Sequence, residues 1–232
     1  MDVISAGWSA RHQELGKMIR KRESFTDVIQ TILDLHSELH MSVVSGTDTE
    51  NTIDLIFKDL RDEEYAVMPS AKDETIAWAI WHIARIEDVT MNILAAGGAQ
   101  VFNKEWAERI QTSVTDTGNA MGDDEIMEFS RSVCKQELLN YRNAVGARSR
   151  EILKKFRPED MKRKVSQNDV RRILEEGGVT QQKDSVWLLD FWGKKDVAGL
   201  VMMPLTRHQT CHLNDCYKWK PIIRKRKNFF ME

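Results

Sequence analysis

The chain has 232 residues, 41% of them hydrophobic, which is enough for one sizeable core. Lys and Arg total 34 against 36 Asp and Glu, so the formal net charge of -2 gives no reason to expect a nucleic-acid-binding or membrane-surface protein. Three cysteines without framework spacing, no signal peptide and no apolar run of about 18 residues predict a cytoplasmic protein that has no disulfide scaffold and no membrane span.

Helices are predicted throughout, because the 12 glycines and 4 prolines are few and β-branched residues seldom alternate with polar ones. The first helical tract begins near Ser9 and, after a break near Glu23, continues over residues 25–44. Residues 45–48 close this tract, and residues 49–60 predict a short helix over the top of a bundle. The expected buried stripe of the 25–44 helix is Val28, Ile32, Leu35, Leu39 and Val43.

The strongest helical pattern covers residues 71–96, follows Pro69 and Ser70, and ends at Gly97. We interpret the polar stretch that runs from there to Gly122 as a connection. It contains a short helix near Phe102 and a loop over residues 115–119.

A third long helix is predicted over residues 123–156, followed by a polar, broken segment over 157–184. The last tract runs from 185 to 219, with Pro204 either opening or kinking the final helix. We therefore predict an all-α four-helix bundle with short extra helices in its crossings. It forms a single domain over residues 1–232, with a core at about 20–220 and a basic C-terminal tail at 221–232.

Two of the chain's six histidine residues, His208 and His212, are spaced to bind one ion together. At 100° per residue they stand about 40° apart on one helix face, among apolar residues. His82, at the flank of the apolar arc of its helix, is the best third ligand. Three neutral imidazoles leave coordination positions open, as in catalytic rather than structural zinc sites. The alternative is that these histidines are hydrogen-bonded core residues.

His36 and His40 form a rival pair at the same spacing. A second metal site is one interpretation of this pair, and a polar gap in the core or a contact at the bundle end is the favoured one. Placement of His36 behind the first site is a further alternative. Glu87 lies on the apolar side of its helix and is expected either to pair with Arg85 or to be a polar member of the core.

Asp215 shares the face of His208 and His212, so it is a candidate to orient an imidazole or to act as a catalytic base. A surface pair with Lys218 is the alternative. Cys211 could ligate a soft metal, although a small buried role is favoured. The tryptophans are interpreted as packing residues, and the basic end of the chain as solvated or bound to a neighbouring subunit.

The segment Thr75-Ile-Ala-Trp-Ala-Ile-Trp-His82-Ile-Ala-Arg-Ile-Glu87-Asp resembles the second long helix of the DinB/YfiT-like superfamily. The late motif from Arg207 to His212 is similar to the family's H-x-x-x-H motif, and the likeness extends over about residues 20–220. It implies a four-helix bundle that binds a divalent metal, commonly zinc or nickel, through His82, His208 and His212. Where family members often continue with Gly-Gln, this chain has Leu213-Asn214-Asp215, so no role is carried over to those positions.

Better understood relatives in that family include thiol S-transferases and a mycothiol-dependent isomerase. The resemblance therefore implies a metal-dependent enzyme of the thiol transferase or hydrolase type. Its substrate is expected to be a small molecule, and a low-molecular-weight thiol is a candidate cofactor. The alternatives are a noncatalytic metal-binding or stress-related protein and a helical interaction module without metal. A homodimer is expected, and neither nucleic acid nor membrane is an expected partner.

Overall fold

Helices form nearly all regular structure in the computed structural model, which describes the backbone of residues 7–229 and side chains as far as residue 225. Within that range, the isolated bridge between Lys164 and Asp196 is the one trace of β-structure. The all-α prediction is confirmed. The elements are α1 (Trp8–Met18), α2 (Phe25–Ser37), α3 (Ser42–Ser45), α4 (Thr52–Phe57), the 3-10 turn η1 (Asp62–Glu64), α5 (Ile76–Asp88), the π-helix η2 (Val89–Ala95), α6 (Lys104–Ile110), α7 (Asp123–Ser132), α8 (Lys135–Lys155), the 3-10 turn η3 (Asp160–Lys162), α9 (Gln167–Glu175), α10 (Lys183–Gly193), α11 (Val197–Leu200), the π-helix η4 (Val201–Arg207) and α12 (His208–Phe229).

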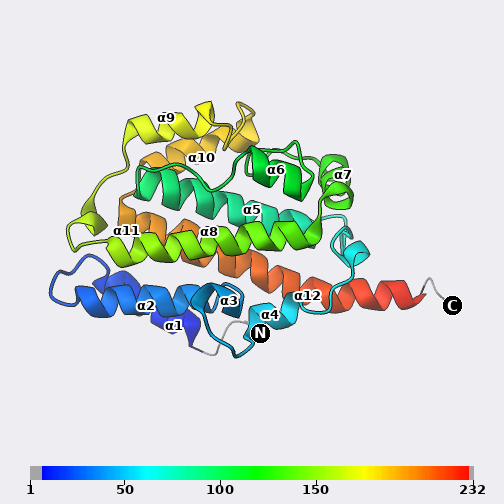
Figure 1. Ribbon diagram of the computed structural model, residues 1–232, viewed down its shortest axis with the longest axis horizontal. Coiled ribbons are helices and arrows are strands. Elements are labelled where there is room, and N and C mark those ends of the chain that lie inside the picture. The colour runs from blue at the N-terminus through cyan, green and yellow to red at the C-terminus, as the bar shows by residue number, and fades with distance from the viewer. Residues whose placement is uncertain (1–6, 230–232) are drawn as a thin grey trace.

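The four-helix bundle consists of α2, α5, α8 and the continuous run from α11 through η4 to α12 (Figure 1). Helix α5 packs against both α8 and α12, and α2 packs against α8 and η4. Every residue from Ile76 to Asp88 is buried, although the sequence predicted only one apolar arc on this helix. A helix that is covered on all sides is the centre of the fold. The loop of residues 111–122 covers the face of α5 that the other bundle helices leave open, and its carbonyls at residues 115–118 accept hydrogen bonds from α5.

The predicted helix over residues 25–44 is broken in the structure. Helix α2 ends at Ser37, and α3 begins only at Ser42. The side chain of Asn51 donates hydrogen bonds to the carbonyls of Ser37 and His40, at 3.2 and 2.7 Å. These bonds satisfy backbone groups that a continuous helix would have paired internally. The break leaves Val43 65% exposed, whereas the other four residues of the expected stripe are fully buried.

Two further predicted helices have different bounds. The helix expected from residue 71 starts at Ile76, because the Thr75 hydroxyl caps it by accepting from the Trp78 N–H at 3.0 Å. Its last part is the π-helix η2, which ends at Ala95, just before the predicted stop at Gly97, where φ is 66°. The helix expected over 123–156 is two helices, α7 and α8. Between them, Val133 is extended and the Cys134 N–H donates to the Ile110 carbonyl at 2.8 Å.

The C-terminal part of the chain is more ordered than predicted. The segment 157–184 contains α9, and Pro204 lies inside η4, just before α12. Residues 221–229 of the expected tail continue α12, while residues 230–232 lie outside the described range. Lys220 and Arg224 both form ion pairs with Asp59, and Arg224 also pairs with Glu64. These contacts attach the end of α12 to α4 and η1.

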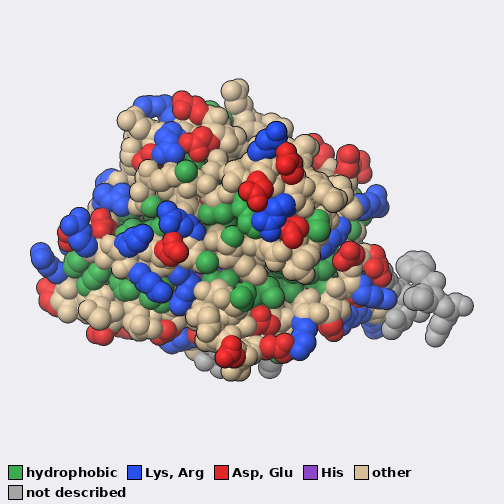
Figure 2. Space-filling model, viewed as in Figure 1, with side chains coloured by type: hydrophobic (Ala, Val, Ile, Leu, Met, Phe, Trp, Pro, Cys, Tyr) green, Lys and Arg blue, Asp and Glu red, His purple; other side chains and the backbone are tan. Residues whose placement is uncertain are grey.

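Charged side chains of both signs are interspersed over the face shown in Figure 2. None of the helices within the described range combines the length and the apolar character needed to cross a membrane.

Gly146 of α8 lies close to His40, which follows α2, and this close approach makes Gly146 sensitive to substitution. A Cβ atom at this buried position would lie 2.5 Å from Nδ1 and 2.6 Å from Cε1 of His40. We expect Gly146→Ala to lower the free energy of unfolding by about 1–3 kcal/mol, since overpacking outweighs the gain of about 1 kcal/mol in helix propensity. Urea denaturation measures this change.

The matched control is Gly16→Ala in α1, where the nearest atom is the flexible end of Met202 at 3.2 Å. This variant should be as stable as the wild type or more so. Equal stability of the two alanine variants would contradict the predicted clash at His40.

Candidate metal centre

Three histidines from two bundle helices meet at one place. His82 lies on α5, His208 is the first residue of α12, and His212 lies one turn further along α12. One ring nitrogen of each lies within 4.8 Å of those of the other two, and Nε2 of His82 is 3.1 Å from Nε2 of His208. His82 is buried, whereas His208 and His212 are partly exposed. The structure thus brings together the three histidines chosen from the sequence.

The orientation of the His82 ring is set by a backbone carbonyl. Its Nδ1 lies 2.8 Å from the Thr117 oxygen, which can only accept, so Nδ1 carries the hydrogen. Nε2 therefore presents its lone pair to Nε2 of His208, 3.1 Å away. The Trp78 ring stacks on His82 with centroids 4.5 Å apart and planes 11° from parallel. A histidine that donates its other N–H to a carbonyl is the usual arrangement at protein metal sites.

The Thr117 bond is one of four between α5 and successive carbonyls of the loop. The donors lie on one helix face, at positions i, i+3, i+4 and i+7. The indole N–H of Trp78 donates to Gly118, that of Trp81 to Asp116, and Nε of Arg85 to Thr115, at 2.9–3.1 Å. Sequence analysis missed this role of the tryptophans, although two Trp N–H groups on the helix face that carries His82 were a signal that a polar partner would cover it.

The three histidines are uncharged at neutral pH, which is the protonation state in which imidazole binds a metal cation. Burial is the largest influence on all three rings. It lowers the pKa of His82 well below its ordinary value, that of His208 to about 3 and that of His212 to about 4. All three imidazoles are therefore neutral at pH 7. Nδ1 of His208 and of His212 is buried and has no hydrogen-bond partner in the described structure. Neutral imidazoles are ligands that Zn²⁺ and Ni²⁺ accept, and ring nitrogens without a protein partner are available here, so the residues fit such an ion.

Two other candidates at this end of α12 have different surroundings. The carboxylate of Asp215 pairs with Lys218 at 3.3 Å, which is the surface pairing predicted as its alternative, and its catalytic role stays a prediction. Cys211 is exposed, so the buried role favoured for it is wrong. Cys216 is buried, and burial raises the pKa of its thiol to about 12.

The rival pair, His36 and His40, surrounds Glu87 in the core. Their Nε2 atoms donate to the two carboxylate oxygens of Glu87, each at 3.0 Å, and all three side chains are fully buried. Burial favours the neutral acid, but the interactions with His40 and His36 outweigh it and hold the pKa of Glu87 well below its usual value. Ring nitrogens and carboxylate are close enough to hold an ion.

A buried cation already serves Glu87 as a counter-charge. Gln209 donates to the Glu87 carboxylate at 2.7 Å and accepts from Arg142 at 3.0 Å. Burial lowers the pKa of Arg142 to about 10, so this side chain stays positive at pH 7. The hydrogen bonds make this a buried polar cluster in the core, which is nearer to the favoured polar gap in the core than to a contact at the bundle end, and the second metal site stays a prediction. Of the two expectations for Glu87, a polar member of the core is confirmed, and the pairing with Arg85 is wrong, because Arg85 pairs with Asp88 at 3.0 Å.

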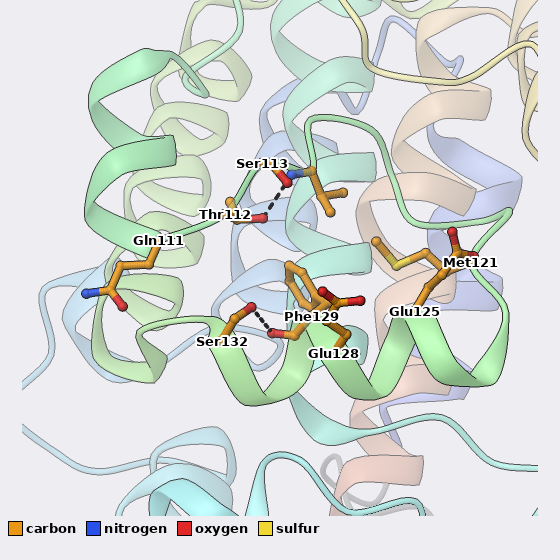
Figure 3. Close-up of a pocket in the computed structure, with 9 residues that line it drawn as sticks. Gln111, Thr112, Ser113, Met121, Glu125, Glu128, Phe129 and Ser132 are labelled. Atoms are coloured by element: carbon orange, nitrogen blue, oxygen red, sulfur yellow. Dashed lines mark hydrogen bonds between the residues drawn. The ribbon is translucent and has the colours of Figure 1, made fainter.

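A hollow of about 410 Å³ lies between α7 and the loop that follows α6 (Figure 3). Glu125, Glu128 and Phe129 of α7 face the loop residues Thr112 and Ser113 across it. No histidine is among the described residues that line this hollow, so it is separate from the three-histidine cluster.

The Glu87 cluster predicts a large loss of stability on substitution. Glu87→Gln removes the negative charge that accepts three hydrogen bonds and leaves Arg142 buried without its counter-charge. We expect the free energy of unfolding in urea to fall by about 3 kcal/mol or more. Glu14→Gln, which affects an exposed pair with Lys17, is the control and should change stability little. Similar curves for the two variants would contradict the role of Glu87.

The family comparison agrees with the sequence resemblance. The crystal structure of a conserved protein from Enterococcus faecalis is similar to this chain at 17% identity, with a TM-score of 0.46, over 83% of this chain and 96% of that one. No curated protein matches the sequence. The family model of the DinB superfamily matches residues 47–179, which is more than half of the chain and includes His82. This protein therefore belongs to the DinB superfamily.

Proposed function

We propose that His82, His208 and His212 hold one divalent ion, zinc or nickel, and that the protein is a metal-dependent enzyme of the thiol transferase or hydrolase type. The orientation of His82 carries this proposal. Its Nδ1 hydrogen is committed to Thr117, and its Nε2 lone pair faces His208. His82 in this way presents an acceptor to His208, and ring nitrogens of all three histidines lie within 4.8 Å of one another, close enough to bind one ion. Membership of the DinB superfamily supports the same conclusion.

Three protein ligands suit a reaction rather than a closed structural site, because coordination positions stay open for a substrate. When bound, a divalent ion lowers the pKa of a thiol or a water molecule and supplies a nucleophile at neutral pH. The chain's own residues would keep the ligands in place. Thr117 holds the His82 tautomer, the stacked Trp78 covers one face of its ring, and the helix backbone keeps His208 and His212 one turn apart. A low-molecular-weight thiol is the cosubstrate that we propose from the family resemblance.

Metal content tests the ligand set. Protein purified without chelator should hold close to one transition-metal ion per chain, and His82→Ala, His208→Ala and His212→Ala should each lower this content at least about tenfold, since each removes one of three ligands. Elemental analysis and the thermal shift on adding zinc or nickel measure the effect.

His36→Ala and His40→Ala are the controls, because these rings bind Glu87 instead. Both should lose stability and keep the metal. Loss of metal in these two variants alone would move the site to the Glu87 cluster, and the absence of metal from all proteins after reconstitution would overturn the proposal.

A noncatalytic role is the second candidate, and the position of the ligands favours it. One ligand lies on α5 and two lie on α12, so an ion would join the two helices and raise stability without turnover. Water-proton relaxation of the cobalt-loaded protein separates the two roles. We expect fast-exchanging water on the ion and its displacement by a small thiol. An ion without exchangeable water would favour the purely structural role.

A further inference from the structure

A small apolar pocket lies directly beside the three-histidine cluster. Its floor consists of buried side chains from three elements: Ile86 of α5, Leu188 and Trp192 of α10, and Pro204 of η4. Its volume is about 120 Å³. Unlike the hollow in Figure 3, this pocket includes one of the candidate ligands, His208, in its lining.

The rim of the pocket reaches the surface. Trp187 is 49% exposed, and its ring lies 5.7 Å from that of Phe191, which is partly buried. Met203 and Asn119, which are partly buried, complete the rim. The exposed Trp187 and the candidate ligand His208 therefore line the same pocket.

Size and lining together define what the pocket can hold. An apolar cavity of about 150 Å³ binds benzene, so a volume of about 120 Å³ takes one ring of that size or a short branched alkyl group. No charged side chain is among the residues that line the pocket, and apart from the indole N–H groups of Trp187 and Trp192 its polar side chains are Asn119 and His208. Pockets of this composition bind the apolar part of a ligand, while the few polar groups orient its reactive part.

We infer that this pocket is the subsite for a benzene-sized apolar group of the substrate and that the polar reactive group of the same molecule lies at His208. The inference rests on the proposed function for the part that concerns the metal. It narrows the substrate class to small molecules with an aryl or branched aliphatic group. Strongly charged or sugar-like substrates do not match the lining of this pocket.

Two pairs of probes test the subsite on the full chain. Benzohydroxamate and acetohydroxamate share a metal-binding group and differ only in a phenyl ring against a methyl group. On zinc-loaded protein, calorimetry should give benzohydroxamate an affinity about tenfold higher or more, because its ring enters the pocket. Toluene, which has no metal-binding group, tests the pocket in metal-free protein. It should shift the methyl NMR signal of Met203, assigned with Met203→Leu.

Leu188→Phe fills the floor of the pocket, and Leu189→Phe is the matched control, since Leu189 packs on the core but does not line the pocket. The preference for benzohydroxamate and the toluene shift should be lost in Leu188→Phe and kept in Leu189→Phe. Trp187→Ala removes part of the exposed rim of the pocket. It therefore provides the same test if Leu188→Phe does not fold. It should reduce the benzohydroxamate preference about threefold or more.

The outcomes separate the subsite from the metal site. Equal affinity for the two hydroxamates on zinc-loaded protein, together with an unchanged Met203 signal in toluene, would overturn the subsite and leave the metal proposal intact. A toluene shift that Leu188→Phe abolishes, in a protein that binds no metal, would support the subsite and overturn the metal proposal. An aryl preference that survives in both Leu188→Phe and Trp187→Ala would place the ring elsewhere and overturn the subsite.

Discussion

The row of hydrogen bonds between α5 and the carbonyls of residues 115–118 is the constraint on which the candidate site depends. Helix α5 is buried on every side, so each polar group that it carries must find a partner within the protein. The loop supplies those partners in succession, and Gly118, at φ 73°, adopts the left-handed conformation beside the Trp78 ring. The hydrogen bonds that satisfy the buried polar groups of α5 also set the tautomer of His82. Core packing and site chemistry are therefore one arrangement.

A second set of contacts sets the relative position of the helices that carry the histidines. Glu87 on α5 binds His36 on α2, His40 just after α2, and Gln209 on α12, and Gln209 in turn binds Arg142 on α8. One buried network thus reaches all four helices of the bundle. Because Gln209 follows His208 directly, its bond to Glu87 holds the start of α12 against α5. Such a network is costly when it is incomplete, which makes the alignment of these helices specific.

The elements outside the bundle determine what lies next to the histidines. Loop 111–122 covers the polar side of α5 and contributes Thr117 and Asn119, whereas α10 and η4 supply the apolar walls beside His208. The π-helix η4 leads directly into α12, so it connects the pocket wall at Pro204 with the two histidines that follow. Segments that looked like connections in the sequence therefore form much of the surroundings of the candidate site.

The sequence alone determined the helical class, the family and the one-turn spacing of His208 and His212, because helical periodicity and motifs are local properties. The sequence also indicated His82 as the third member of the histidine cluster, since the motif that contains it lies within one helix. Only the tertiary structure decided where α2 stops, since Asn51, 14 and 11 residues further along the chain, binds the carbonyls of Ser37 and His40. It likewise decided the partners of Glu87, the carbonyl row of the loop and the pocket at His208. These contacts join residues far apart in the chain, and periodicity within one helix carries no information about what covers its other face.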